Sequence, residues 1–415
     1  QRNNSSFRVM KGAVRQIAEL CGLKDKEIER LEGSMGKLAG KGYRTLAVAI
    51  NENTEKSRLI GLVAMIDNPR PDSKKLIQEL KHLGISVKML TGDALPIAKE
   101  IADKVGIEKN IVKAPDLKKY AKENLIKAAE IAEKSDGFAE IYPEDKYIIV
   151  KSLQSKSHIV GMTGDGVNDA PALKQAEVGI AVSNATDVAK GSASVVLTSE
   201  GLSSIVDLIK TGRMIYQRII SWILNKIIKT FTIVVFVTLS FMFTGLFVVT
   251  AFDMVLLLFL TDFVTLSLAT DKVRWSYKPD TWNITELVKI AVALGIVTLI
   301  EHFGLLYIGL KYFGLQFSIP ELNTFVFEML FFSGVFTIFM VRERGHFWNS
   351  APSRTLVLAI MLDMIFVGTI STVGIPGLSP LPIYYTFGIV VYYFVLTLLV
   401  NDSIKYLLIK YKGIE

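Results

Sequence analysis

The sequence contains a single cysteine, Cys21, among its 415 residues. One cysteine excludes a scaffold held together by disulfides and fits a reducing compartment. The chain also has no initiator methionine and no signal peptide, and it opens at Gln1 in sequence that reads as the middle of a domain. We therefore expect a fragment, or one half of a larger protein.

Long apolar runs are missing from the first half of the chain and dominate the second half. Six runs each approach the ~20 residues that a helix needs to cross the hydrocarbon core of a membrane. They lie at 221–244, 253–270, 287–310, 324–341, 354–374 and 383–401. The chain is long enough for two or three domains, so we expect a soluble region followed by six membrane spans.

Basic residues are few in alternate loops between these runs and gather in the others. By the positive-inside rule, the basic loops face the cytoplasm, which places the soluble region and the C-terminus there too. The net charge of +7 follows from this topology and does not call for nucleic acid as a partner. The basic residues are Lys272, Arg274, Lys278, Arg342, Arg344, Arg354, Lys405, Lys410 and Lys412.

Residues 58–208 alternate strand-like and helix-like segments, an order typical of a doubly wound parallel sheet. The expected strands are 59–66, 85–90 and 158–162, and the expected helices are 72–83, 96–105 and 147–154.

The most informative segment, Gly161–Leu173, reads GMTGDGVNDAPAL. It follows a β-prone run and precedes a helix-like run, which predicts a loop at the carboxyl end of a strand, where open α/β sheets bind ligands. Asp165 and Asp169, with Asn168 beside them, suit Mg²⁺, a hard cation that prefers oxygen ligands. Gly164 would let the backbone approach a phosphate. An acidic surface turn is the alternative interpretation.

Two more segments suggest a phosphate pocket in the same sheet. Thr91-Gly92-Asp93 closes a strand, and the Thr91 hydroxyl and Gly92 amide could hold a phosphoryl oxygen. Lys146 lies just before an expected helix and could offset developing negative charge. Each pattern alone is weak, because many turns read Thr-Gly-Asp and a lone lysine is usually a solvated surface charge.

Together, and in this order, these motifs resemble the haloacid-dehalogenase-like core of P-type ATPases, the cation pumps that form an aspartyl-phosphate. Asp67–Arg70 is similar to the family's Asp-Pro-Pro-Arg segment, with Asn68 as a departure. The resemblance implies Mg²⁺ as cofactor and ATP as substrate. It implies the C-terminal end of a nucleotide-binding domain over 1–57, a Rossmann-like phosphorylation domain over 58–215, and the fifth to tenth transmembrane helices of a pump over 216–415.

Two basic residues near the N-terminus resemble nucleotide-binding motifs of the same family. Lys11, in Lys-Gly-Ala, would contact adenine or phosphate, and Arg44, in Gly-Tyr-Arg-Thr-Leu-Ala, would bridge toward the phosphates. Without the resemblance both read as surface charges. The family's acceptor aspartate, in Asp-Lys-Thr-Gly-Thr, has no match here. We therefore expect the N-terminal half of the pump as a partner, and no ATP hydrolysis by this chain alone.

Asp262 lies near the middle of the second span, where an ionisable residue is costly and is a candidate functional site. The segment 260–273 resembles the sixth helix of plasma-membrane proton pumps, and 277–282 and 342–348 resemble two of their cytoplasmic segments. The resemblance implies proton export across the plasma membrane, with Asp262 as the carrier. Thr232 is a departure, since plant proton pumps carry an arginine there.

The departure at Thr232 leaves transport of another cation open. Lys226 and Lys229 lie about one helical turn earlier and could supply the missing positive charge. Other acids within the spans are alternative carriers or paired structural groups: Glu301, Glu328 and Asp363.

Two further classes of protein remain open. A membrane-anchored phosphatase could share this core, and dependence of hydrolysis on an ion would separate it from a pump. A decayed pump could serve as a channel or regulatory subunit, but the intact loops 91–93 and 163–169 count against decay.

Overall fold

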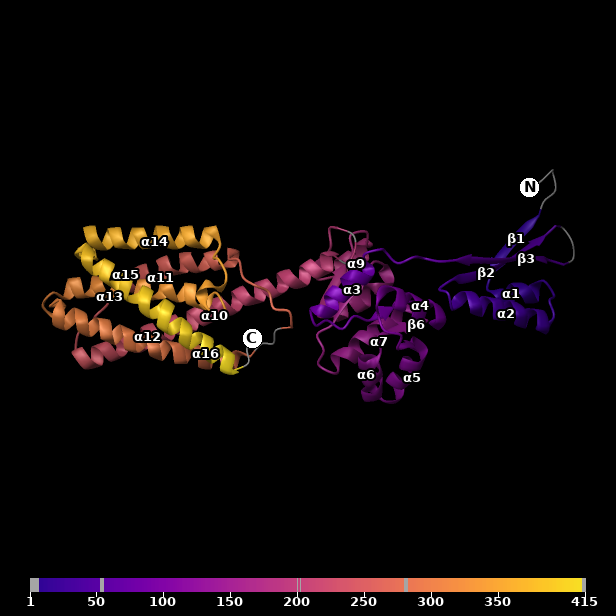
Figure 1. Ribbon diagram of the computed structural model, residues 1–415, viewed down its shortest axis with the longest axis horizontal. Helices are drawn as coiled ribbons and strands as arrows, with labels where there is room; N and C mark the ends of the chain where they lie inside the picture. The colour runs from indigo at the N-terminus through magenta and orange to yellow at the C-terminus, as the bar shows by residue number, and fades with distance from the viewer. Residues whose placement is uncertain (1–6, 53–55, 200, 202, 280–282, 413–415) are drawn as a thin grey trace. The chain divides into compact units, whose positions relative to one another are not determined.

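The computed structural model describes residues 7–52, 56–199, 201, 203–279 and 283–412 of the chain (Figure 1). The chain divides into two compact units, Gln1–Leu208 and Ile209–Glu415. Residues 280–282, which carry part of the resemblance to proton pumps, lie outside the described residues.

The first unit opens with a three-stranded antiparallel sheet in the order β1-β2-β3. Its strands are β1 (Arg8–Gly12), β2 (Arg44–Asn51) and β3 (Arg58–Met65), and the intervening helices are α1 (Val14–Leu20) and α2 (Asp25–Ala39).

The prediction that placed residues 59–66 in the parallel sheet is wrong. The strand exists, but β3 pairs antiparallel with β2, because Leu59 and Leu62 pack against the small core formed by Ala47, Ala49 and the α1 helix. We therefore propose that the first domain boundary lies after Met65 instead of before Arg58.

The rest of the first unit contains two three-stranded parallel sheets, in the orders β4-β6-β5 and β7-β8-β9. Their strands are β4 (Met89–Leu90), β5 (Ile111–Lys113), β6 (Gly137–Ala139), β7 (Gly161–Gly164), β8 (Val178–Ala181) and β9 (Val195–Val196). Their helices are α3 (Ser73–His82), α4 (Leu95–Val105), α5 (Ala114–Glu123), α6 (Leu125–Lys134), α7 (Pro143–Gln154), η1 (Val167–Asp169), α8 (Ala170–Gln175) and α9 (Asp187–Ser192).

The two parallel sheets share apolar neighbours. Leu90 and Val160 pack against the buried cores of both. One close approach explains a glycine: a Cβ on Gly179 would lie 2.3 Å from the Leu173 carbonyl oxygen, so α8 could not pack this tightly on β8 with a larger residue there. The alternation of parallel strands with helices agrees with the sequence prediction.

Among the described residues, six helices are long and apolar enough to cross a membrane, as the hydropathy predicted, and they form the second unit, apart from the first residues of α10. They are α10 (Ser203–Thr244), α11 with the short helix η2 (Ala251–Thr270), α12 (Ile284–Tyr312), α13 (Ile319–Val341), α14 (Arg354–Val373) and the last helix (Ile383–Tyr411). The last helix consists of α15 (Ile383–Val395), a π-helical turn η5 (Leu396–Asn401) and α16 (Asp402–Lys412). The first of the six begins before residue 221, and the last continues beyond residue 401, because polar residues extend both helices past the apolar runs.

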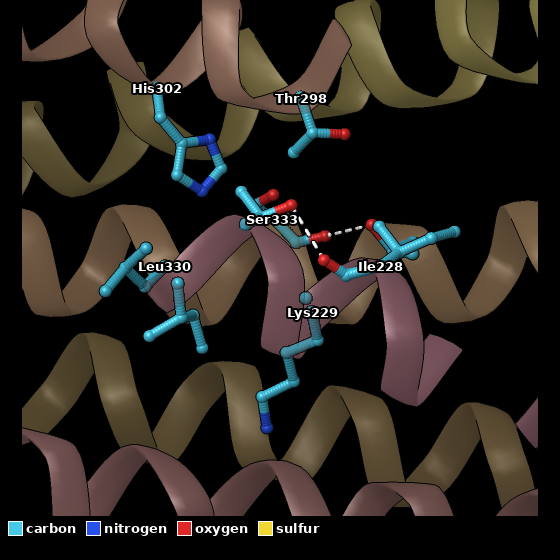
Figure 2. A pocket seen from close by; sticks show the side chains of 10 residues that line it. Ile228, Lys229, Thr298, His302, Leu330 and Ser333 are labelled. Carbon is cyan, nitrogen blue, oxygen red and sulfur yellow. Dashed lines mark hydrogen bonds between the residues drawn. The ribbon is translucent and has the colours of Figure 1, made fainter. Parts of the chain in front are cut away.

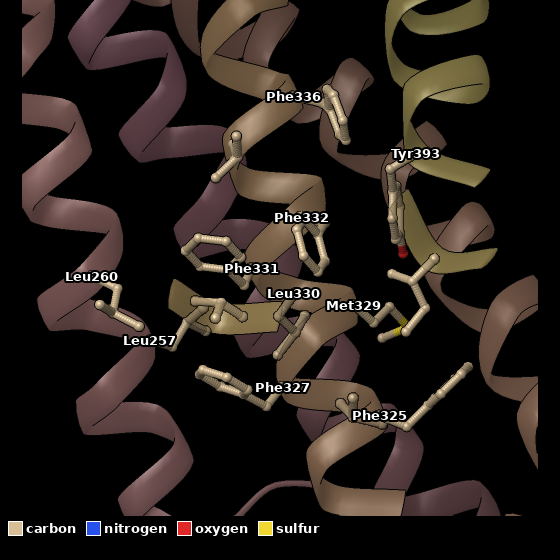
Figure 3. Close-up of a cluster of buried hydrophobic side chains, with 14 of the residues drawn as sticks. Leu257, Leu260, Phe325, Phe327, Met329, Leu330, Phe331, Phe332, Phe336 and Tyr393 are labelled. Carbon is tan, nitrogen blue, oxygen red and sulfur yellow. The ribbon is translucent and has the colours of Figure 1, made fainter. Parts of the chain in front are cut away.

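The α13 helix is the centre of this bundle. Its apolar window is 94% buried, against 22–50% for the other five helices. Phe325, Phe327, Phe331 and Phe332 are fully buried along it and contact neighbours on every side (Figure 3). A helix that is apolar all round is expected at such a position.

A buried ion pair joins three helix ends in this unit. Arg342, after α13, donates from Nε to Asp271 Oδ2 at 2.7 Å, and both side chains are essentially inaccessible. The other Asp271 oxygen accepts the Ser353 amide at 2.8 Å, and the remaining guanidinium groups donate to the carbonyls of Ser350 and Lys272. All the charged groups are therefore satisfied in a dry site.

Replacing Arg342 by methionine should destabilise this unit strongly, because it leaves the Asp271 carboxylate buried without a cation. The expected loss is about 3–5 kcal/mol. Lys289→Met removes the exposed partner of Glu286 and should cost only about 0–1 kcal/mol. Thermal unfolding of the two variants in detergent measures the difference, and equal losses would contradict a central role for the Arg342–Asp271 pair.

Candidate functional site

Asp169 is the organising residue of the loop after β7. It is 3% exposed, and its Oδ2 accepts the backbone amides of Asp165 at 3.1 Å and Gly166 at 3.3 Å. A Cβ on Gly164 would lie 2.5 Å from the Asp169 Cβ. Gly164 therefore allows the loop to fold back on Asp169, a requirement separate from the close approach to phosphate that we predicted.

Lys146 forms an ion pair with the second oxygen of Asp169, Oδ1. The prediction that Lys146 precedes a helix is wrong, because α7 begins at Pro143, which suits the first helical position. Asp145 then accepts the Tyr142 amide at 2.9 Å and satisfies the start of the helix. Lys146 thus extends toward Asp169 from the first turn of a rigid element.

The charge state of Asp169 follows from these contacts. Burial raises the pKa of its carboxyl group, but the bond from Lys146 and the two backbone amides outweigh burial, so the pKa lies below its ordinary value. Asp169 is therefore ionised at neutral pH.

The two carboxylates predicted to hold Mg²⁺ differ in their availability. Both oxygens of Asp169 are occupied by protein groups, whereas Asp165 and the neighbouring Asn168 are exposed at the end of the loop. Asp165 offers the oxygen ligands that Mg²⁺ prefers. Over the described ranges, no group of at least three His, Cys, Asp or Glu side chains is arranged to hold a metal ion. A metal here would therefore depend on Asp165 together with ligands from a substrate or water.

Thr91 and Asp93 form a local turn at the carboxyl end of β4. The Thr91 hydroxyl donates to Asp93 Oδ2 at 2.9 Å and accepts the Asp93 amide at 3.1 Å. The Thr91 carbonyl accepts the Ile141 amide at 3.2 Å, just after β6, and α7 with Lys146 follows directly. The end of β4, which carries Thr91, and the segment that leads from β6 into α7 and Lys146 are thus neighbours. Gly92 lies between the two residues of the turn.

Lys11 and Arg44 are not brought together. Both are exposed on the antiparallel sheet, where Lys11 is opposite Val48 and Arg44 is opposite Met65. Their predicted contacts with a nucleotide stay a prediction.

The α11 helix carries another charged site, in the second unit. Asp262 forms an ion pair with Lys226 of α10, and its side chain remains 52% exposed, so the lysine covers only one side of it. Lys229 donates to the Thr261 hydroxyl. Thr232 is buried and donates to the Ile228 carbonyl at 2.7 Å. The positive charge expected beside Asp262 is thus supplied by Lys226.

A small cavity of about 20 Å³ lies beside Lys229, between α10, α12 and α13 (Figure 2). Thr298, His302 and Ser333 contribute polar groups to its wall, while the Lys229 ammonium group points away from it (Figure 2). The cavity has room for a single water molecule and is too small for a hydrated cation.

Sequence reasoning missed the polar residues of the last helix. Asp402 is fully buried and contacts His346 at 2.8 Å and Lys405 at 2.8 Å. Asn401, just before it, donates to Glu301 of α12 at 3.1 Å. The adjacent Asn-Asp pair after a long apolar run was the available signal, but nothing in the sequence identified its partners.

Comparisons with known proteins support part of this interpretation. Residues 2–177 match the family of haloacid dehalogenase-like hydrolases. A putative cation-transporting ATPase of Methanocaldococcus jannaschii is 40% identical over 413 residues, which cover 98% of this chain and 51% of that protein. Plasma membrane ATPase 1 of Saccharomyces cerevisiae is 36% identical over 81% of this chain and 37% of its own length. A probable plasma membrane ATPase of Dictyostelium discoideum is 34% identical over 90% of this chain and 36% of its own length.

The predicted fold class is therefore confirmed. A haloacid-dehalogenase-like domain with parallel sheets is followed by six helices long and apolar enough to span a membrane. The chain spans about half the length, or less, of the relatives that it matches.

Lys146→Met should raise the pKa of Asp169, because burial is then opposed only by the two backbone amides. A carboxyl with a lowered pKa contributes stability above the ordinary aspartate pKa, and that stability is lost as the pH falls through the lowered value. In the variant the loss should begin at a higher pH.

The measurement is the thermal midpoint of the full chain as a function of acid pH. Lys109→Met is the matched control, since Lys109 pairs with Asp103 at 3.2 Å and both side chains are exposed, so the loss of stability at acid pH should be nearly unchanged. If the thermal midpoint of Lys146→Met falls over the same acid pH range as that of the parent protein, Lys146 does not stabilise the ionised form of Asp169.

Proposed function

We propose that this chain is the C-terminal part of a P-type ATPase that exports protons across the plasma membrane. The observation that carries the proposal is the Asp262–Lys226 ion pair between α10 and α11, two helices of membrane-spanning length in a chain that begins with a haloacid-dehalogenase-like domain. The names of the yeast and Dictyostelium relatives, both plasma membrane ATPases, support the location.

In this proposal the first unit surrounds a phosphoryl group held on an aspartate outside this chain. The Thr91 hydroxyl and Gly92 amide face that group from the end of β4, and the Lys146 ammonium offsets its negative charge. Asp169 positions Lys146 through the ion pair at Oδ1 and orients the Asp165 backbone through Oδ2. Asp165 would hold Mg²⁺, which when bound neutralises phosphate charge. Lys11 and Arg44 would contact the nucleotide.

Asp262 is the proposed carrier in the membrane unit. Lys226 is the ion-pair partner of Asp262. In the proposed cycle the distance between the two groups changes when the proton is taken up and released. A single titratable group with a mobile counter-charge needs no cage of oxygen ligands, which Na⁺, K⁺ or Ca²⁺ would require.

Transport of another cation is the second candidate. It is favoured by the relative with the highest identity among those named above, whose name specifies a cation-transporting ATPase without saying which cation.

In the complete pump, Asp165→Asn should reduce phosphorylation at limiting Mg²⁺ and leave ATP binding largely intact, because an amide is a weaker ligand for a hard cation than a carboxylate. The measurement is acid-stable label from radioactive ATP across a Mg²⁺ titration. Asn168→Ala is the control for the loop, since Asn168 is also exposed there but is uncharged. Normal phosphorylation of the Asp165 variant at limiting Mg²⁺ would show that Asp165 does not bind the metal.

In the complete pump, Asp262→Asn should abolish ion flux while the protein still phosphorylates from ATP. The amide keeps the size of the side chain and removes the titratable group. The measurement is proton flux into inside-out vesicles, with the phosphoenzyme level as an internal standard. Asp253→Asn is the matched control on the same helix, because an amide oxygen at residue 253 can still accept the Thr250 amide that caps α11.

Undiminished proton flux in Asp262→Asn would show that another acid carries the proton. Flux in the parent pump that follows the concentration of one metal ion instead of pH would favour the cation alternative.

A further inference from the structure

Glu301 of α12 is a buried acid of the second unit. The residue is 7% exposed, and its Oε2 accepts a single hydrogen bond, from Asn401 Nδ2 at 3.1 Å. No lysine, arginine or histidine forms an ion pair with it in the part of the chain that the structure describes. A buried carboxylate usually has such a partner, because an isolated charge in a dry interior is very unfavourable.

The amide that contacts Glu301 has an unsatisfied oxygen. Asn401 is fully buried, and its Oδ1 has no hydrogen-bond partner among the described residues. Asn401 Oδ1 and Nδ2 belong to the same planar amide group. The amide that contacts the Glu301 carboxyl through Nδ2 is therefore also the one with the unsatisfied oxygen. An ionised carboxylate has only acceptors and cannot satisfy it, whereas a protonated carboxyl has one O–H to donate.

The last helix holds Asn401 in place. Asn401 ends the π-helical turn η5, a rare helical form that is frequent at functional sites. Nine residues before Asn401, Tyr392 donates to the Glu301 carbonyl at 2.9 Å, and the adjacent Tyr393 hydroxyl contacts His302 Nδ1 at 3.1 Å. The two helices are therefore also joined by hydrogen bonds on the N-terminal side of the acid–amide contact.

The titratable groups around this contact carry no compensating cation. Tyr392 and Tyr393 face Glu301 from α15, and His302 neighbours it on α12. Asp402 follows Asn401, but its oxygens contact Lys405, His346 and the Phe347 amide. The positive charge of Lys405 is thus taken up by Asp402 and by the backbone carbonyls of Met340 and Glu343.

We propose that Glu301 and Asn401 form a proton-binding site, in which the Glu301 carboxyl is protonated and donates its O–H to Asn401 Oδ1 while Asn401 Nδ2 donates back to Glu301. The paired acid and amide satisfy both buried groups with two hydrogen bonds. Binding takes one proton from water and changes the charge of the carboxyl from −1 to 0, and no other covalent bond is formed or broken. The site does not depend on which ion the proposed pump carries.

The test is infrared spectroscopy of the purified protein at neutral pH without ATP, because a protonated carboxylic acid has a carbonyl band separate from that of a carboxylate. Glu301→Gln should remove one such band. The glutamine amide can donate to Asn401 Oδ1, so this variant imitates the protonated pair and should remain folded. Glu286→Gln, on the same helix, is the matched control and should leave the band unchanged, since Glu286 forms an ion pair with Lys289 at 2.7 Å.

A second variant, Asn401→Leu, should shift the Glu301 band without removing it, because the acid then loses its amide partner and takes on the frequency of a less hydrogen-bonded group. If the spectra of the parent protein and Glu301→Gln are identical in the acid carbonyl region, Glu301 is ionised and the proposal is wrong. The result is independent of proton flux, so a failure of the proposed pump function would leave the band in place, and a missing band would leave the flux prediction for Asp262 untouched.

Discussion

A charge removed from water needs either an opposite charge or a change of protonation, and this constraint organises both units of the chain. Asp169 has Lys146, Asp271 has Arg342, and Asp262 has Lys226. In each case the partner comes from a different helix or loop, so the pair also fixes the distance between two elements. The pairs differ in depth: the Asp271–Arg342 pair is sealed, whereas Asp262 is half exposed and only one side of it is covered. A buried pair with all its hydrogen bonds formed suits a fixed contact between helices. A partly exposed pair suits a site at which the partner moves.

Much of the fold could be predicted from local sequence. Six apolar runs predicted six helices, and the alternation of strands and helices predicted a parallel sheet. The failure at residues 59–66 has a physical cause. An apolar strand reads the same whether its neighbours are parallel or antiparallel, and only the packing of Leu59 and Leu62 on the first core decides its partner. The start of α7 was also missed, because Pro143 reads as a loop residue until it is seen to occupy the first helical position.

The sequence predicted which types of residue form the candidate site. It predicted less well what each of them does. The sequence predicted acids and a lysine near one strand edge, but treated Asp165 and Asp169 as equivalent ligands. Their difference depends on contacts across 23 positions, from Lys146 to Asp169, and on the hydrogen bonds from the amides of residues 165 and 166. Spacing along the chain cannot show which of two neighbouring carboxylates turns inward. The glycine at 164 was the one local signal, since it permits the close approach that buries Asp169.

Glu301 is a buried acid for which the same constraint points to a proton in place of a cation. It is buried, yet its one contact is an amide, and that amide has an unsatisfied oxygen beside it. No lysine, arginine or histidine among the described residues pairs with this carboxylate. A proton compensates the charge and satisfies the oxygen in one step. The pairing also depends on the π-helical turn, because a regular α-helical turn would rotate Asn401 relative to α12. The protonation of one carboxyl group and the shape of the last helix are thus linked through a single side-chain amide.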